Sequence, residues 1–319
     1  MPPAFASILL LLLAAGLWGL SIPVMKALGV EQTLLAPGTG SLAATLASLA
    51  ARYGMAAVAV LALARISPFR LNREEWKHGA ILAVFTGAGM SLQVDGLNYT
   101  LASTGGFLIA LYCVLVPLIA WAARERRMTP ILAACCFLVL AGLAVLTGYD
   151  PRKLGLGRGE WESLAAACMF AAQISRVERI PAGKADPLRV TAVLLGLVAV
   201  GSAAGLLLVP HGPLAFTAIH ASPRAFLLTL ALALFGTAAP FALMNRYQAR
   251  VGSVAAGFIY CCEPLTTALG AFWLPELLVR EAGSYPNESA TPRLLMGGAL
   301  ILAANLLLMR DKGNTVVRD

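Results

Sequence analysis

Charged side chains are scarce in this sequence. Only 13% of its residues are Asp, Glu, Lys or Arg, while 59% are hydrophobic, and the mean hydropathy is +0.78. Soluble domains carry about 25% charged residues. The composition therefore excludes an ordinary soluble domain and predicts a protein that lies in a lipid bilayer.

The sequence also lacks the motifs that a membrane enzyme or an ATP-driven pump needs. Its three histidines, His78, His211 and His220, fall at the edges of apolar stretches or between them, and there is no HExxH motif. No GxxxxGK[ST] motif is present to hold ATP phosphates. The six cysteines lie inside apolar stretches without CxxC spacing, as packing residues do. We expect no enzyme activity, no metal and no cofactor.

Long apolar stretches are what the sequence has instead. A helix needs about 20 mostly apolar residues to cross the hydrocarbon core of a bilayer. Ten stretches qualify, at residues 6–28, 43–66, 79–99, 103–123, 130–148, 158–177, 188–209, 225–245, 251–273 and 292–310. The predicted fold class is an all-α polytopic membrane protein with ten transmembrane helices.

A block of the first half recurs in the second half. Residues 102–108 match residues 253–259, which sets Phe107 and Phe258 151 positions apart. This indicates two copies of one five-helix unit, at 1–150 and at 151–319, the second ending in a short cytoplasmic tail. Because five is odd, the second copy must enter the bilayer upside down. Inverted repeats of this kind are typical of transporters.

The distribution of Lys and Arg predicts the orientation of the chain. With the N-terminus inside, 16 of these residues fall on the inner side and 8 on the outer side. An excess of basic residues marks the cytoplasmic side, so both termini are expected in the cytoplasm, although Arg152, Lys153 and Arg158 form a basic cluster on the outer side. The basic residues lie in short clusters between helices, so the net charge of +8 does not indicate nucleic-acid binding.

Several motifs resemble a known family. The main one is QVDGLNYTLASTGGF at residues 93–107, continuing to VLVPL at 114–118. Shorter ones are Trp18-Gly19, Arg52, residues 124–126, Gly159-Glu160 and Glu263-Pro264. Together they resemble the EamA-type transporters of the drug/metabolite transporter superfamily. The resemblance implies ten helices in two inverted repeats, a substrate cavity between the repeats, and export of small metabolites such as amino acids by alternating access in a bacterial cytoplasmic membrane.

Three features depart from the pattern of that family. Asp95 stands where the family usually has an apolar residue, residues 31–42 lengthen the first outer loop, and residues 277–292 insert a polar outer loop before the last helix. These departures affect the substrate class more than the fold.

The candidate substrate-binding residues are the polar and aromatic side chains at membrane depth. An ionisable side chain there is costly and needs a partner or a water-filled cavity. Pro264 leaves a carbonyl near Tyr260 without its helical partner, and Pro117 and Pro240 could kink their helices in the same way. Gln93 and Asp95 are two residues apart on one helix, so only one of them can face a cavity squarely. The candidates are Trp18, Arg52, Gln93, Asp95, Tyr112, Gln173, Tyr260 and Glu263.

Two substrate classes remain open at this stage. One acid, one base and several aromatics fit a small metabolite or a drug-like solute, with Glu263 and Asp95 binding an amine or a proton and Arg52 attracting a carboxylate. The alternative is a nucleotide-sugar or lipid-linked substrate, whose phosphates would favour several cations in the cavity. Arg52 is nearly alone there, with Lys26 close to the outer end of its helix. The partners expected are thus the bilayer, a small molecule and protons; the sequence does not indicate an oligomeric state.

Overall fold

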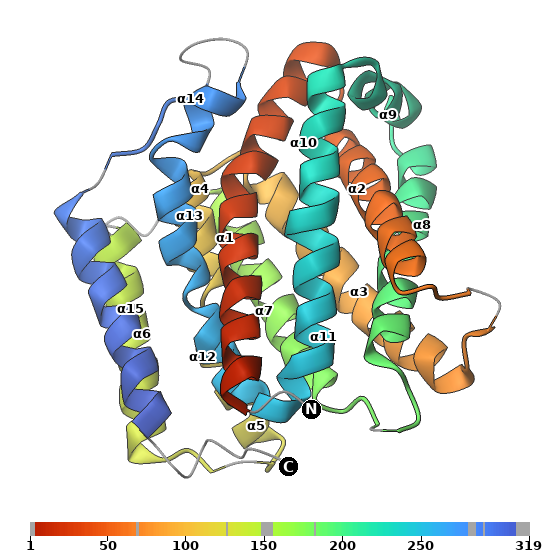
Figure 1. Cartoon of the computed structure of the whole chain (residues 1–319). Helices are drawn as coiled ribbons and strands as arrows, with labels where there is room; N and C mark the ends of the chain where they lie inside the picture. Colours follow the sequence, from red (N-terminus) through yellow and green to blue (C-terminus); the bar gives the residue numbers. More distant parts are fainter. Residues whose placement is uncertain are drawn as a thin grey trace.

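A computed structural model describes residues 4–67, 70–125, 127–147, 156–181, 183–279, 285–289 and 291–310. Within these ranges the chain forms helices joined by turns and short loops (Figure 1). The start of α1 and the end of α15 lie at the same end of the bundle (Figure 1). This agrees with the expected all-helical fold.

The first part of the chain runs from α1 to α6 and the second part from α7 to α15. The helices of the first part are α1 (Ala4–Leu35), α2 (Ser41–Leu63), α3 (Arg73–Gly96), α4 (Ala102–Ile109), α5 (Tyr112–Ala122) and α6 (Pro130–Thr147). Those of the second part are α7 (Arg158–Val177), α8 (Pro187–Leu208), α9 (Gly212–Ala221), α10 (Pro223–Ala233), η2 (Leu234–Ala238), α11 (Ala239–Val251), α12 (Ser253–Tyr260), α13 (Glu263–Ala271), α14 (Leu274–Leu278) and α15 (Pro292–Arg310).

Five helical segments among the described residues are long and apolar enough to cross a membrane. They are Phe5–Leu35, Ser41–Leu63, Pro187–Leu208, Pro223–Val251 and Ser253–Ala271. Shorter apolar helices run over Tyr112–Ala122, Pro130–Gly142 and Pro292–Leu308. The chain is therefore an all-helical protein with several membrane-spanning helices.

Polar residues fix where individual helices begin. Asn72 and Glu75 form a capping box at the start of α3, in which each side chain accepts from the other residue's backbone N–H. Asp186 caps α8 by accepting from the amides of Leu188 and Arg189. These caps lie at helix ends, where backbone donors would otherwise have no partner.

Two helices expected to be continuous are each broken in the middle. The fourth predicted span is divided into α4 and α5 at Ala110 and Leu111, and the ninth into α12 and α13 at Cys261 and Cys262. At both breaks the backbone switches to bonds three residues back, such as Cys113 to Ala110 and Cys262 to Ile259. Pro117 lies inside α5, six residues after Leu111.

The loop after the first helix is shorter than expected. Residues 31–35 belong to the predicted loop at 31–42, but α1 continues to Leu35. Glu31 and Gln32 are buried, and they find partners from other elements: the Ser222 hydroxyl donates to the Glu31 carboxylate at 3.2 Å, and the Gln32 amide donates to the Ala44 carbonyl at 3.3 Å. These contacts explain why polar residues continue the helix.

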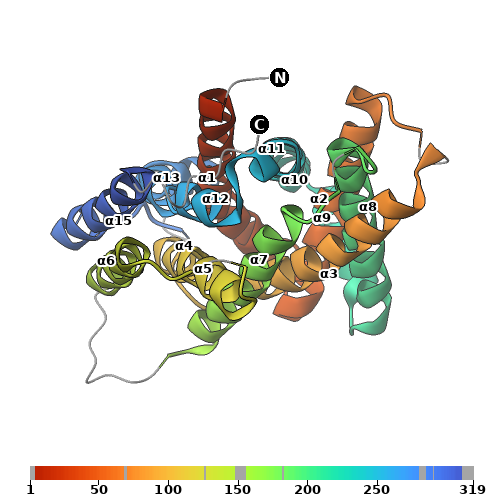
Figure 2. The same cartoon turned by 90° about the horizontal axis from the view of Figure 1, so that it is seen from below.

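Helices from the two parts of the chain pack against one another. α1 packs on α11 and α13 of the second part, while α7 packs on α3 and α5 of the first. Seen along the bundle, α6 and α15 lie together at one side and α2 and α8 at the other, with α1, α7 and the broken helices between them (Figure 2). A Cβ built on Gly142 of α6 would lie 2.8 Å from the Gly297 carbonyl of α15, so small residues set this close approach.

Some expectations fall outside the described residues. They are the boundary between the two predicted units at 150 and 151, and the basic residues Arg126, Arg152, Lys153, Arg280, Lys312 and Arg318.

The loop predicted at 277–292 is described in part, and it is shorter than predicted because residues 277–278 belong to α14 and Pro292 begins α15. In it Tyr285 is buried, and the Glu288 amide donates to the Ala271 carbonyl at 2.8 Å. Burial, and after it the Glu288 carboxylate, raise the pKa of Tyr285 above its ordinary value. The described part of the loop is therefore anchored to the bundle.

Candidate functional site

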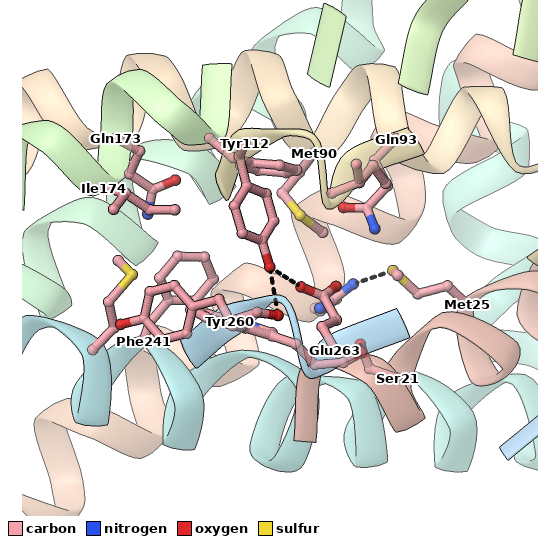
Figure 3. A pocket seen from close by; sticks show the side chains of 15 residues that line it. Ser21, Met25, Met90, Gln93, Tyr112, Gln173, Ile174, Phe241, Tyr260 and Glu263 are labelled. Atoms are coloured by element: carbon pink, nitrogen blue, oxygen red, sulfur yellow. Dashed lines mark hydrogen bonds between the residues drawn. The ribbon is translucent and has the colours of Figure 1, made fainter. Parts of the chain in front are cut away.

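A cavity lies between the two parts of the chain. Helices α1 to α5 and α7, α11, α12 and α13 all contribute side chains to it. Its lining consists of Trp18, Ser21, Met25, Arg52, Met90, Gln93, Ile109, Tyr112, Phe170, Gln173, Ile174, Phe241, Met244, Tyr260 and Glu263 (Figure 3).

Seven of the eight candidate residues line this one cavity. They are Trp18, Arg52, Gln93, Tyr112, Gln173, Tyr260 and Glu263. The sequence distance between Trp18 and Glu263 shows that the fold, and not local spacing, brings them together. Their roles in binding remain predictions.

Asp95, the eighth candidate, is not part of the lining. Its carboxylate pairs with Arg158 of α7, whose Nε also donates to Glu162 at 2.7 Å. The Arg158 guanidinium lies 4.3 Å from the centre of the Tyr99 ring. Gln93 faces the cavity instead, as expected for two side chains about 200° apart on a helix.

Glu263 and Tyr112 meet at the break between α12 and α13. Pro264 has no backbone N–H, so the Tyr260 carbonyl one turn earlier has no helical donor from that position. The Tyr112 hydroxyl takes this place and lies 2.8 Å from the Tyr260 carbonyl oxygen. It also lies 2.9 Å from Glu263 Oε2 (Figure 3). Tyr112, Tyr260 and Glu263 are all buried, so this small network joins α5 to the second broken helix away from bulk water.

Arg52 of α2 is held at a second irregular turn. Pro240 removes the donor that would serve the Gly236 carbonyl, and residues 234–238 form a π-helical turn there. Arg52 Nη2 donates to the Gly236 carbonyl at 2.8 Å, and its Nε donates to the Thr237 hydroxyl. Only 1% of Arg52 is exposed. Both proline-freed carbonyls are thus satisfied by side chains of the first part of the chain.

The Arg52 cation has neutral partners. Besides Gly236 and Thr237 it contacts the Met25 sulfur at 2.8 Å, and among the described residues it forms no ion pair. A buried cation that lacks a carboxylate partner can attract an anionic group of a bound molecule.

Aromatic rings cover the cavity on one side. The Trp18 ring lies edge-on to Tyr260, with centroids 5.4 Å apart, and edge-on to Phe241 at 5.5 Å. The Tyr260 hydroxyl bonds to Gln248 Oε1 at 3.1 Å, and Gln248 donates to the Ile174 carbonyl at 2.7 Å. The hydroxyl of Tyr260 is therefore engaged by protein, which leaves its ring as the surface presented to the cavity.

The cavity is narrow in this conformation. The centres of water-sized molecules can occupy about 50 Å³ of it, and one water needs about 10–15 Å³ by the same measure. A few water molecules fit, so a metabolite can enter only if the lining helices or side chains move apart.

Helical spacing could have found several lining residues that the sequence analysis missed. Ser21 and Met25 follow Trp18 by three and seven positions, and Met90 precedes Gln93 by three. Phe170 precedes Gln173 by three, and Ile174 follows Phe170 by four. Because residues three or four apart share a helix face, each polar candidate indicates its apolar neighbours in the lining.

A second, more polar cavity lies toward the end of the bundle where α1 ends. It has a volume of about 310 Å³, and its lining includes Lys26, Thr33, Ser41, Asn98 and Tyr99. The Lys26 ammonium donates to the carbonyls of Leu97 and Thr100. Lys26 therefore supports the backbone that follows α3.

Comparison with known proteins shows what this chain is similar to. Residues 5–148 match the EamA-like transporter family. A protein of Archaeoglobus fulgidus described as an uncharacterized transporter is 29% identical over 110 residues, which is 34% of this chain and 34% of that protein. The match thus spans about a third of the archaeal relative.

A solved structure described only as the crystal structure of a protein shares the fold. It has a TM-score of 0.59 and 18% identity, and the match covers 92% of this chain and 96% of that one. The EamA-type resemblance seen in the motifs is confirmed over residues 5–148, and the matches support a membrane transporter.

Proposed function

We propose that the protein is a secondary transporter that exports small metabolites, such as amino acids or drug-like solutes, by alternating access. The observation that carries this proposal is the composition of the central cavity. Both parts of the chain contribute to it, and it combines one buried acid, Glu263, one buried base, Arg52, and an aromatic wall. A site between two structural units near the middle of the bilayer is what alternating access requires.

The proposed architecture has ten membrane-spanning helices in two inverted five-helix repeats, 1–150 and 151–319. The repeated block at an offset of 151 residues supports it, because the breaks at Ala110 and Cys261 are separated by the same offset. Discontinuous helices near the membrane centre often form the binding sites of such transporters. The excess of Lys and Arg on one side supports a cytoplasmic location of both termini, and the membrane of the proposal is a bacterial cytoplasmic membrane.

In the proposed binding mode, Arg52 attracts the carboxylate of the substrate and Glu263 binds its amine or a proton. Gln93 and Gln173 add polar contacts, and the rings of Trp18 and Tyr260 cover the apolar part. Asp95 pairs with Arg158, so its proposed role is to join α3 to α7. Since the cavity has room for only a few waters, substrate binding must accompany an opening toward one side of the membrane.

A phosphate-bearing substrate, such as a nucleotide sugar or a lipid-linked sugar, has less support. Phosphate groups favour several cationic donors. Within the described part of the chain Arg52 is the one cation that lines the central cavity. This favours a solute with a single anionic group.

The test is a thermal-shift screen of the purified full-length chain in detergent against amino acids, amines, nucleotide sugars and phosphorylated head groups. A ligand that binds the folded state raises its apparent stability. We expect a zwitterionic metabolite to stabilise the native protein and to lose this effect in the Arg52→Ala variant. Stabilisation by phosphorylated compounds alone would favour the alternative substrate class.

Arg224→Ala is the matched control for that variant. Arg224 also donates to backbone carbonyls, those of Leu277, Leu278 and Val279, but it lies outside the cavity. The control should lower stability without changing which ligands bind. Equal loss of the ligand effect in both variants would contradict a role for Arg52 in recognition.

A further inference from the structure

The Tyr112 hydroxyl has two oxygen neighbours and only one hydrogen to offer. Its oxygen lies 2.8 Å from the Tyr260 carbonyl oxygen and 2.9 Å from Glu263 Oε2 (Figure 3). A carbonyl can only accept a hydrogen bond, whereas a carboxyl group accepts when ionised and can donate when protonated. The two short contacts therefore carry information about the proton on Glu263.

When Glu263 is neutral, the Tyr112 hydroxyl donates its hydrogen to the Tyr260 carbonyl and not to Glu263. Pro264 leaves that carbonyl without its usual helical donor, and Tyr260 is 1% exposed, so water does not replace the donor easily. If Tyr112 donates to Tyr260, its contact with Glu263 is a hydrogen bond only when Glu263 is protonated and donates to the Tyr112 oxygen. Both contacts are then satisfied at once.

An ionised Glu263 would change the pattern. A carboxylate is a stronger acceptor than a backbone carbonyl, so the Tyr112 hydroxyl would turn to Glu263. The Tyr260 carbonyl would lose its donor at the break between α12 and α13. The charge state of Glu263 and the state of the broken helix are linked through one hydroxyl group.

We propose that Glu263 holds a proton in this conformation and that Tyr112 is a switch residue that transmits the loss of this proton to the α12–α13 break. The carboxyl O–H bond of Glu263 breaks and its proton passes to water in the cavity, which leaves a carboxylate. The O–H bond of Tyr112 stays intact, and only its direction changes, from the Tyr260 carbonyl to Glu263. This inference rests on the proposed transport function and names the proton as its coupling ion.

The groups around Glu263 allow this exchange. Arg52 of α2 is the charged group that shares the described cavity, and it is held by Gly236 and Thr237. The other titratable groups near Glu263 are Tyr112 and Cys113 of α5 and Tyr260, Cys261 and Cys262 beside the break. The cavity side chains from α1, α7 and α11 are uncharged. With Glu263 protonated the cavity carries one positive charge, and with Glu263 ionised it carries none.

The experiment is infrared difference spectroscopy of the purified full-length chain in detergent during a pH titration. We expect a carbonyl stretching band of a protonated carboxylic acid at neutral pH, which disappears at high pH and is absent from Glu263→Gln. In Tyr112→Phe the band should shift, because the acid loses its hydrogen-bond partner. A native spectrum without this band would overturn the proton on Glu263, and an unshifted band in Tyr112→Phe would overturn the switch.

Two controls keep the result interpretable. Glu276→Gln removes an exposed carboxylate and should leave the band unchanged. The amide of Glu263→Gln can donate to Tyr112 as the protonated acid does, so this variant should keep the melting temperature of the native chain. The spectroscopic result does not depend on transport: if no solute stabilises the protein but the band is present, the proposed function fails while the proton site stands.

Discussion

Tyr112 and Glu263 are 151 residues apart in the sequence, and the Tyr112 hydroxyl lies 2.9 Å from the Glu263 carboxylate. The same separation joins Ala110 and Cys261, where the thiol donates to the carbonyl at 3.8 Å. It is also the offset of the repeated block around Phe107 and Phe258. In the proposed architecture of two repeats, equivalent positions can touch only near the axis that relates the repeats. We therefore propose that this axis passes between the two helix breaks.

Gly19 should be the least replaceable glycine of α1. A Cβ at this position would collide with the Thr266 hydroxyl and with the Glu263 carbonyl of α13. Gly19→Ala should lower the free energy of unfolding by about 1–3 kcal/mol through overpacking, measured as a lower melting temperature in detergent. Gly16→Ala is the control on the same helix, because the nearest atom to its Cβ is 3.9 Å away. A Gly19→Ala protein as stable as Gly16→Ala would contradict the close packing of α1 on α13.

Tyr112 and Pro264 should be energetically coupled. Tyr112→Phe leaves the buried Tyr260 carbonyl without its donor, which costs about 1–3 kcal/mol. In a Pro264→Ala background the new backbone N–H can supply that donor, so Tyr112→Phe should cost less. Apparent stabilities of the native chain, both single variants and the double variant give the coupling energy, expected at about 0.5–3 kcal/mol. Additive effects would show that Tyr112 does not serve the carbonyl freed by Pro264.

The donors of Arg52 should matter for stability apart from its charge. Arg52→Met fills much of the same space but leaves the Gly236 carbonyl without a donor, at a cost of about 1–3 kcal/mol. Arg52→Lys keeps the positive charge and can still donate one hydrogen bond to the turn, so it should be less destabilising than Arg52→Met. It should also retain part of the binding of an anionic ligand. Thermal unfolding with and without ligand separates the two effects. Equal stability of the two variants would argue against the contact with the π-helical turn.

The ion pair of Asp95 with Arg158 should stabilise the protein more than that of Glu125 with Arg179 at the other end of α7. The Asp95 side chain is only 6% exposed, whereas both side chains of the second pair are about half exposed. Arg158→Ala leaves a buried carboxylate without its cation and should be clearly destabilising. Arg179→Ala should change the free energy of unfolding by about 0–1 kcal/mol.

Thermal unfolding with and without ligand tests whether Asp95 contributes to binding. Asp95→Asn should leave ligand stabilisation unchanged, because the side chain does not line the cavity. If Asp95→Asn keeps the melting temperature of the free protein but is no longer stabilised by ligand, Asp95 contributes to binding after all.

The parts of the site that could be predicted are those set by local backbone chemistry. Pro264 identifies the Tyr260 carbonyl four residues earlier as lacking its donor, and the structure shows a helix break and a side-chain donor there. Helical geometry likewise limits Gln93 and Asp95 to one cavity residue. Which of the two faces inward could not be predicted, because it depends on the rotation of α3 against its neighbours.

Contacts between residues far apart in the sequence could not be predicted. Pro240 indicates an irregular turn, but its partner Arg52 is 184 residues from Gly236. The sequence predicts that Glu31 lies in a loop. In the structure it lies in α1, where its carboxylate accepts from the hydroxyl of Ser222, 191 residues later. No local pattern indicates such contacts, since they depend on how the two parts of the chain pack.

The packing of α1 on α13 has a consequence for synthesis of the protein. α1 ends at Leu35 and α13 at Ala271, and ribosomes add about 5–20 residues per second. The face of α1 that carries Gly16 and Gly19 is therefore synthesised on the order of ten seconds or longer before α13, the helix on which it packs. During that time lipid or the insertion machinery has to cover this face, and a polypeptide stopped after α6 would leave it permanently unmatched.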